Sequence, residues 1–530
     1  MKHSPWLALL AAAAVSIALW QLHQASRGVV TRRVDLAGTP VTVYRPAKGP
    51  AEGPAAGPAA GTPGPVVVIA HGFAGSQQLM QSFALSFAHN GYTAVTFDFP
   101  GHGRNARPLT GSLTEIDGAT RTLVASLAGV ARYARGLGDG RLAVLGHSMA
   151  TDIVVRYAES DPQVAATIAV SMFSPAVTAT EPRNLLVIVG DWEGTLKREA
   201  LRALGLATAP ATAQPGITYG DPAAGTARRV AWSDHVEHVS VLFSQQSSRE
   251  AIAWLDQVFG IVRTTPLVLD GRGPWILLLV GGVALLARSL APWLPVIAHP
   301  RAGAARSWRR LWLPLLLPLV ATPLLLRVLP TRFLPVVVGD YLAVHFALYG
   351  LLTALCLLWS RPAGAARSRP LSTRVPLATR VPLATRVPLA GAALAMAAFG
   401  LVALAWPIDS YFTAFMPGPG RVVLTLAMLA GTLAYFLSDE WLTRGEGAAR
   451  GAYLASKIAF LASLAAAVAL DFERLFFLVI IVPVMVLFFL VYGLFSHWAY
   501  RQTGHPFVAG FANAFAFAWA IGVTFPLVAG

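Results

Sequence analysis

The sequence predicts two unlike parts: a mostly parallel α/β domain, followed by an all-α bundle of transmembrane helices. Composition is the first observation, because the 530 residues are 55% hydrophobic and only 13% charged, which is too apolar for an ordinary soluble enzyme. Distribution is the second: residues 30–262 mix charge, glycine and short apolar runs, whereas apolar stretches of about 20 residues recur from Pro274 onward. In the first part, short apolar strands alternate with helical patterns, which indicates a parallel sheet.

The amino-terminal segment has the composition of a membrane span. Lys2 precedes an apolar core from about Pro5 to Leu22, as in a signal anchor or a cleaved signal peptide. No clear small-x-small cleavage site directly follows the core, so an anchor is favoured, and either interpretation exports the segment from residue 30 onward. We therefore expect residues 1–29 to form an N-terminal signal anchor and transmembrane helix.

The sequence predicts that residues 30–262 form one α/β domain, with helices on both faces of a mostly parallel sheet. The predicted strands are continuous apolar runs, which indicates burial on both faces. The predicted strands are 66–70, 92–98, 142–146, 165–170, 184–190 and 228–232. The predicted helices lie at about 76–89, 116–135 and 149–159. In such sheets the reactive groups lie at the carboxyl ends of the strands, so the residues directly after each strand are the candidates.

The stretch VLGHSMAT, residues 144–151, places a serine between a predicted strand and a predicted helix. A sharp turn with small residues on both sides would lift the Ser148 hydroxyl clear of the sheet. The backbone N–H of Met149 would then lie at the helix amino terminus, where it can bind an oxyanion. The pattern is G-x-S-x-A rather than G-x-S-x-G, and Ala150 is still small enough for the close approach. The alternative interpretation is a serine that caps a helix.

Three further strand ends carry polar or glycine-rich segments. HGFAG, residues 71–75, directly follows the strand VVVIA. A carboxylate pair, Asp191 and Glu193, follows the strand NLLVIVG. His235 and His238 follow the last predicted strand, and an amphipathic run comes after them. A serine, a carboxylate and a histidine in this chain order are the groups that a serine triad needs, because the carboxylate orients the histidine and stabilises its imidazolium form.

These four segments resemble the α/β-hydrolase family, and its dienelactone-hydrolase and esterase-like members in particular. The resemblance covers somewhat under half of the chain and implies that Ser148 is the nucleophile. The family's acid usually stands three residues after the glycine that ends its strand, which implies Glu193, with Asp191 as the fallback. The sequence Glu-His-Val before a helix resembles the family's histidine loop, which implies His238 rather than His235 as the base. The His-Gly segment implies an oxyanion hole formed by the backbone N–H groups of Phe73 and Met149.

The sequence predicts that residues 263–530 form a membrane domain with about eight transmembrane helices. The candidate spans are roughly 274–295, 311–330, 334–359, 387–408, 421–438, 452–470, 475–497 and 506–529. Two short segments stand apart by composition: the Gly/Pro/Ala tract 47–65 predicts a flexible loop, and three copies of TRVPLA at 373–390 predict a low-complexity insertion. Asp340 and His345 are the clearest ionisable pair inside a span, and five residues of helix place them on different faces.

The positive charge of the chain indicates orientation rather than nucleic-acid binding. The formal net charge is +15, but many arginines lie in short links between spans, where the positive-inside rule places them. The links predicted to be cytoplasmic contain Arg301, Arg306, Arg309, Arg310, Arg361, Arg367, Arg369, Arg374, Arg380 and Arg386. The protein is therefore expected in the cell (plasma or inner) membrane as a multi-pass protein, with residues 30–262 on the extracytoplasmic side.

The sequence predicts a membrane-anchored extracytoplasmic serine hydrolase that acts on an ester, thioester or amide. Two alternatives stay open: an acyltransferase that uses the same triad, and a non-catalytic hydrolase-fold binding module on a transporter or scaffold membrane domain. No cofactor and no metal site are indicated. The expected partners are the lipid bilayer and a small-molecule or acyl-lipid substrate. The single cysteine, Cys356, forms no intrachain disulfide.

Overall fold

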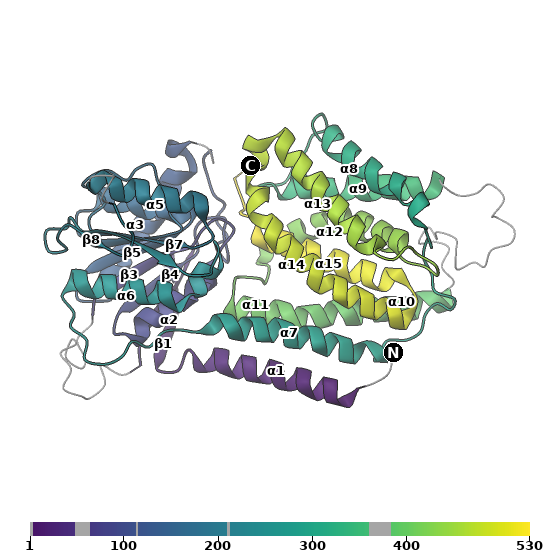
Figure 1. The fold of residues 1–530 in the computed structure, drawn as a ribbon, viewed down its shortest axis with the longest axis horizontal. Coiled ribbons are helices and arrows are strands. Elements are labelled where there is room, and N and C mark those ends of the chain that lie inside the picture. Colours follow the sequence, from purple (N-terminus) through teal and green to yellow (C-terminus); the bar gives the residue numbers. More distant parts are fainter. Residues whose placement is uncertain (1–3, 48–63, 113–114, 209–212, 360–382, 530) are drawn as a thin grey trace.

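The structure is a computed structural model that describes residues 4–47, 64–112, 115–208, 213–359 and 383–529. Most of the 47–65 tract and most of the TRVPLA copies lie outside the described residues. An α/β part and a helical part lie side by side (Figure 1). The fold class predicted from the sequence is confirmed, because a mostly parallel sheet with helices is followed by a region of apolar helices.

The α/β part contains a nine-stranded sheet in the order β1-β2-β4-β3-β5-β6-β7-β9-β8. The six strands from β4 to β9 in this order pair in parallel, whereas β1, β2 and β8 at the edges pair antiparallel. The strands are β1 (Val29–Leu36), β2 (Thr39–Pro46), β3 (Val66–Ala70), β4 (Thr93–Phe97), β5 (Leu142–His147), β6 (Val164–Val170), β7 (Leu185–Gly190), β8 (Thr218–Tyr219) and β9 (Arg228–Ser233).

The central strands are continuous apolar runs because both faces of the sheet are covered. In β3, Val67 and Ile69 pack on the face that contacts α2 (Gln81–His89) and α6 (Gln245–Phe259). Val66 and Val68 of the same strand pack on the opposite face, against α3 (Arg121–Arg135) and α4 (Met149–Ser160). A further helix, α5 (Gly194–Ala207), packs beside β7 and β9. Successive side chains of a strand point to opposite faces, so each strand contributes to two cores.

Eight helices of the described chain are long and apolar enough to cross a membrane, and seven of them follow residue 263. They include α1 (Pro5–Gln24), which packs along α7 (Figure 1). The helices after the α/β part are α7 (Arg272–Leu290), α8 (Trp312–Leu325), α9 (Gly339–Trp359), α10 (Leu383–Gly400), α11 (Trp406–Tyr411), α12 (Pro419–Thr443), α13 (Ala452–Leu470), α14 (Phe472–Thr503) and α15 (Pro506–Thr524).

The candidate span at 311–330 differs from the prediction. It contains the 14-residue helix α8, which carries Pro318 and Pro323 and ends at Leu325. A helix of this length extends about 21 Å, which is short of the ~30 Å hydrocarbon core of a bilayer. The segment is apolar as expected, but proline removes backbone donors and limits the helix, so this segment does not cross as one helix.

The two parts contact each other at one end of the bundle. The chain enters β1 soon after α1 ends, and it returns to the bundle at α7. The last described residues bind back to the loop after β4: Leu109 N–H donates to the Leu527 carbonyl (2.8 Å), and Leu527 N–H donates to the Gly101 carbonyl (2.9 Å). The carboxyl edge of the sheet is therefore held against the bundle by the far end of the chain.

Candidate active site

Ser148 lies in a strained turn between β5 and α4. Its φ of 52° and ψ of −120° place a non-glycine residue in a region that L residues rarely adopt, and such strain is typical of a nucleophile turn between strand and helix. A Cβ on Gly146 would lie 2.4 Å from the Ala150 carbonyl oxygen, so only glycine fits there. Ala150 itself is fully buried, which explains why a small residue stands two positions after the serine.

His238 connects Ser148 to a carboxylate. Its Nε2 lies 2.8 Å from Ser148 Oγ, and its Nδ1 lies 2.6 Å from Glu193 Oε1. His238 is one-third exposed at its side chain, whereas the Glu193 side chain is almost fully buried. The three side chains come from the ends of β5, β7 and β9, which are adjacent or near-adjacent at the carboxyl edge of the sheet. The row can accept the serine proton at Nε2 and stabilise the resulting imidazolium at Nδ1.

Of the two candidate acids, the structure brings Glu193 and not Asp191 to the histidine. The second oxygen of Glu193, Oε2, accepts from Ser171 Oγ and from the Gly190 N–H, each at 2.7 Å. Asp191 instead pairs with Lys197 Nζ at 2.8 Å. The hydrogen bond and charge of Lys197 lower the pKa of this exposed carboxyl. Both carboxylates of the D-W-E segment therefore have a partner, but only one faces the serine.

Of the two candidate histidines, only His238 contacts Ser148. His235 is exposed and adopts a φ of 58° in the turn after β9. The backbone of the histidine loop is fixed by Glu237, whose carboxylate accepts from the N–H groups of Val239 (2.9 Å) and Ser240 (2.8 Å). Glu237 thus caps the turn that follows His238.

The glycine-rich loop after β3 lies directly against the serine turn. A Cβ on Gly72 would be 3.0 Å from both Ser148 Cβ and His147 Nδ1, so this close approach requires glycine. The N–H groups of Phe73 and Met149, which the sequence singles out as oxyanion donors, have no acceptor within the described residues. Backbone N–H groups without an acceptor, one next to Ser148 in the chain and one next to Gly72, are available to bind a developing negative charge.

Comparison with known proteins identifies the family of the α/β part. Residues 61–215 match the family model described as serine aminopeptidase, S33. The chain carries an α/β-hydrolase domain. The protein is therefore a hydrolase of the α/β-hydrolase type, as the resemblance implied. The matched range includes Ser148 and Glu193, whereas His238 lies after it.

The search of the curated proteins found no match. Among solved structures, similar chains include a membrane phospholipase A described as a novel bacterial virulence factor, with 16% identity, a TM-score of 0.30, and coverage of 47% of this chain and 93% of that one. Dienelactone hydrolase from Anabaena variabilis is another, with 15% identity, a TM-score of 0.30, and coverage of 45% of this chain and 100% of that one.

The contacts of three residues that support the site of the hydrolase domain were not predicted from the sequence. Ser171 donates to Glu193, and His147 Nε2 lies 2.9 Å from the His238 carbonyl oxygen. His71 binds the Gly72 carbonyl through Nδ1 (2.8 Å) and accepts from the Phe99 N–H through Nε2 (3.1 Å). Burial lowers the pKa of His147 to about 3 and also lowers the pKa of His71, so both rings stay neutral. In hindsight, histidine directly before the serine and directly after β3 was the available signal.

The edge of the sheet that carries Ser148, His238 and Glu193 faces the bundle. The Phe73 ring stacks on Phe477 of α14 with centroids 4.1 Å apart. Arg104, in the loop after β4, forms an ion pair with Asp409 of α11 at 2.6 Å. Arg421 of α12 donates to the Gly101 carbonyl at 2.7 Å. The loops that surround the serine are thus packed on the ends of the membrane-type helices rather than on open solvent.

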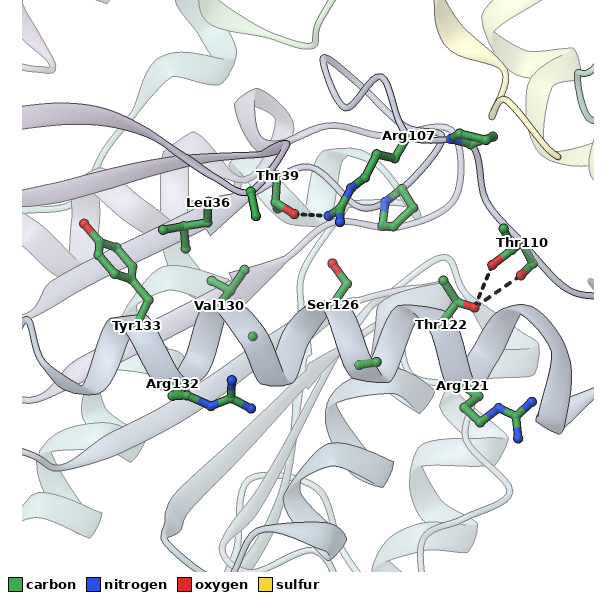
Figure 2. A pocket seen from close by; sticks show the side chains of 15 residues that line it. Leu36, Thr39, Arg107, Thr110, Arg121, Thr122, Ser126, Val130, Arg132 and Tyr133 are labelled. Carbon is green, nitrogen blue, oxygen red and sulfur yellow. Dashed lines mark hydrogen bonds between the residues drawn. The ribbon is translucent and has the colours of Figure 1, made fainter.

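A separate groove of about 1060 Å³ lies between α3 and the β1–β2 turn, and none of the site residues lines it. Figure 2 shows its wall, where Arg107 reaches Thr39 and Thr122 faces Thr110. Within the described residues, no group of three or more His, Cys, Asp or Glu side chains could hold a metal ion.

Proposed function

We propose that this protein is a membrane-anchored serine hydrolase in which Ser148, His238 and Glu193 form a catalytic triad. The observation that carries the proposal is the unbroken row of hydrogen bonds, 2.8 Å from Ser148 Oγ to His238 Nε2 and 2.6 Å from His238 Nδ1 to Glu193 Oε1. The row occurs beside two free backbone N–H groups, which supply the oxyanion hole. Glu193 is the proposed acid, whereas Asp191 forms an ion pair with Lys197 and has a structural role.

The proposed reaction proceeds through an acyl-enzyme. His238 takes the Ser148 proton while Oγ attacks the carbonyl carbon of an ester, thioester or amide. The carbonyl oxygen becomes an oxyanion and accepts from the N–H groups of Phe73 and Met149. His238 then gives the proton to the leaving group, and the acyl group stays on Ser148. Water attacks in the second half with His238 as the base again, which releases the acid and restores the serine.

We place the hydrolase domain on the extracytoplasmic side of the membrane. It contacts the ends of α11, α12 and α14, and the link between α7 and α8 lies at the opposite end of the helices. This link contains Arg301, Arg306, Arg309 and Arg310. Short links rich in arginine stay in the cytoplasm, so the domain at the other end lies outside it.

The substrate proposed for the site is an acyl ester of a membrane amphiphile. Phe477, which stacks on Phe73, lies five residues after α14 begins, or about 8 Å along the helix axis. The oxyanion loop is then at the level of the membrane surface, where the ester bonds of lipids lie. Phe173 and Trp192 follow β6 and β7 at the same edge, and each is 66% exposed. Exposed aromatic rings are typical of a membrane interface.

The triad is tested by labelling the purified full-length protein with a fluorophosphonate probe. Wild type is expected to be labelled, and Ser148→Ala is expected to lose the label while its melting temperature stays within a few degrees. Ser160→Ala, at the end of the same helix, is the matched control and should be labelled like wild type. A labelled Ser148→Ala protein, or a folded wild type without label, would contradict the proposal.

The substrate class is tested by presenting the same ester chemistry in two forms. Hydrolysis of a soluble short-chain nitrophenyl ester is compared with hydrolysis of a diacyl lipid in vesicles. Trp192→Ala and Phe173→Ala are expected to raise the apparent KM for the vesicle lipid about tenfold, because they remove contacts with the interface, and to leave the soluble ester unaffected. Equal effects on both substrates would restrict these residues to a role inside the active site.

A further inference from the structure

A row of buried polar side chains crosses the helical bundle, apart from the hydrolase site. We call it the polar column. It contains an imidazole, three phenols, an ammonium group and a carboxylate, all at most 5% exposed. From the end that faces the hydrolase domain to the opposite end, the polar column consists of Tyr341, His345, Tyr349, Tyr435, Lys457 and Asp439. Ionisable side chains inside a membrane bundle are costly, and they commonly mark a path for ions or protons.

The first half of the column runs along α9. The ring centroids of Tyr341 and His345 are 5.8 Å apart, and those of His345 and Tyr349 are 6.4 Å apart. The spacing of four residues places the three rings on one face of the helix. The sequence indicated that Asp340 and His345 lie on different faces of the helix and do not pair. The Asp340 carboxylate instead accepts from the N–H groups of Phe333 (3.1 Å) and Tyr341 (2.8 Å).

The second half of the column continues on α12 and α13. The Tyr349 ring lies 5.7 Å from the Tyr435 ring, and Lys457 Nζ lies 5.1 Å over the Tyr435 ring. Lys457 forms an ion pair with Asp439. Three helices therefore contribute successive members, and each member contacts the next.

The column, together with Tyr453 and Arg444 beyond it, extends over most of the thickness of the bundle. Tyr341 and Tyr349 are separated by about 12 Å along α9. Beyond Lys457, the Tyr453 ring lies between the Lys457 ammonium and the Arg444 guanidinium, each 4.4 Å from its centroid. Arg444 is partly exposed at the end of α12, about 13 Å along that helix from Tyr435. The two helix segments together approach the ~30 Å depth of a hydrocarbon core.

Unpartnered polar atoms distinguish this column from ordinary packing. Neither ring nitrogen of His345 has a hydrogen-bond partner in the part of the chain that the structure describes. The hydroxyl groups of Tyr349 and Tyr435 are also without partners there. These three side chains are 0%, 1% and 1% exposed. An unpaired buried polar group costs about 1–3 kcal/mol, so a row of them calls for a function that uses the free donors and acceptors.

We propose that the polar column is a proton relay across the bundle. The neutral imidazole of His345 accepts a proton at one nitrogen and releases the other nitrogen's proton, and each tyrosine hydroxyl accepts one proton while it donates its own. Successive ring centroids lie 5.7 to 6.4 Å apart, and no hydrogen bond joins these rings among the described residues, so the proposed relay requires a water molecule between neighbouring members. At the far end, the Lys457 ammonium gives a proton to the Asp439 carboxylate and the resulting amine takes the next proton from the Tyr435 side, while Asp439 releases its proton. One proton therefore enters at one end for each proton that leaves at the other, driven by the proton gradient, and no other bond changes. This activity is independent of the hydrolase reaction.

Phe460 is positioned to restrict the relay. Its ring lies 5.5 Å from His345, 5.2 Å from Tyr349 and 4.5 Å from Tyr435. An apolar ring among three polar ones limits how much water the column holds and keeps conduction slow. Replacement of this ring by a methyl group opens space for water at the centre of the column.

The relay is tested with the full-length protein in proteoliposomes that contain a pH-sensitive dye, with a potassium gradient and valinomycin to set the membrane potential. We expect wild type to carry protons at least fivefold faster than protein-free liposomes. Tyr435→Phe and Tyr349→Phe should each reduce the rate at least fivefold, and Phe460→Ala should increase it. Because the removed hydroxyls have no partners among the described residues, the tyrosine variants should melt no lower than wild type, which separates loss of conduction from misfolding.

Tyr492→Phe is the matched control, because Tyr492 is a bundle tyrosine of α14 outside the column. It should conduct like wild type. A wild type no faster than protein-free liposomes overturns the proposal. Tyr349→Phe and Tyr435→Phe variants that both conduct like wild type also overturn it, since the column would then not carry the protons.

Discussion

The histidine of the hydrolase site and the histidine of the polar column differ in how their ring nitrogens are paired. In the hydrolase domain, both oxygens of Glu193 have protein partners, and His238 is held on both of its ring nitrogens. In the bundle, His345 has no partner on either nitrogen within the described chain. Fully paired groups hold a single geometry, which suits chemistry on one carbonyl. Unpaired groups stay available for protons or water.

The largest predicted effect on activity is at His238. We expect His238→Ala to lower kcat/KM for a soluble ester by about 10⁴-fold or more, because the serine loses its base. His235→Ala should retain wild-type activity, since that exposed ring does not contact Ser148. Initial rates at saturating and at limiting ester concentration give kcat and kcat/KM for each variant. Comparable losses in the two variants would contradict the assignment of His238.

The next largest effect is expected at the acid. Glu193→Gln should lower kcat roughly 10³-fold, because an amide no longer stabilises the imidazolium and its NH₂ group opposes the Nδ1–H tautomer. Asp191→Asn should cost less than a few fold, since Asp191 binds Lys197 instead. Fluorophosphonate labelling rates give a second readout. An Asp191→Asn protein as impaired as Glu193→Gln would make Asp191 the acid.

The sequence predicts the hydrolase half well because its signals are local. The turn around Ser148, the spacing from Gly190 to Glu193 and the loop of His238 each depend on a few consecutive residues, and the structure brings those three side chains together. Their catalytic roles stay a prediction. Ser171 and His147 were missed because their contacts arise only when neighbouring strands align in the sheet.

The sequence predicts the contacts inside the bundle less well than those of the hydrolase site. Hydropathy identifies the apolar stretches, and His345 stands out in the sequence as an ionisable residue inside a span. Tyr349, Tyr435 and Lys457 cannot be connected with it from the sequence, because they lie on three helices and meet only through tertiary packing. The short helix α8 was also missed, since hydropathy does not register where proline limits a helix.

The junction between the halves offers a stability test. Arg272 and Asp270 form an ion pair with almost no exposed surface, and Arg272 also binds Gln81 of α2 and the Tyr411 carbonyl. Asp270→Asn leaves a buried charge without its counter-ion, so we expect a loss of about 3 kcal/mol or more.

Thermal unfolding of the full-length protein in detergent measures this loss. Asp139→Asn is the matched control, because it breaks an exposed pair with Arg141 and should cost less than about 1 kcal/mol. Equal melting temperatures for the two variants would show that the junction pair does not hold the halves together.

The last predicted effect is the loss of stability of the hydrolase domain at low pH. Burial lowers the pKa of His147 and of His102 to about 3, from 6.5. The unfolded chain therefore binds more protons than the folded one between pH 6.5 and 3. Stability is full above pH 6.5 and falls as the pH decreases, by up to about 1.4 kcal/mol per pH unit for each histidine.

His147→Gln isolates one of these histidines. The amide can still donate to the His238 carbonyl, but it does not titrate, so the decrease in stability from pH 6.5 to 5 should be smaller than in wild type by up to about 2 kcal/mol. The melting temperature of the hydrolase domain at several pH values measures the difference. Parallel profiles would mean that His147 becomes protonated within the folded site. In that case the site would tolerate a charge beside His238, and its single fixed geometry would not depend on keeping that ring neutral.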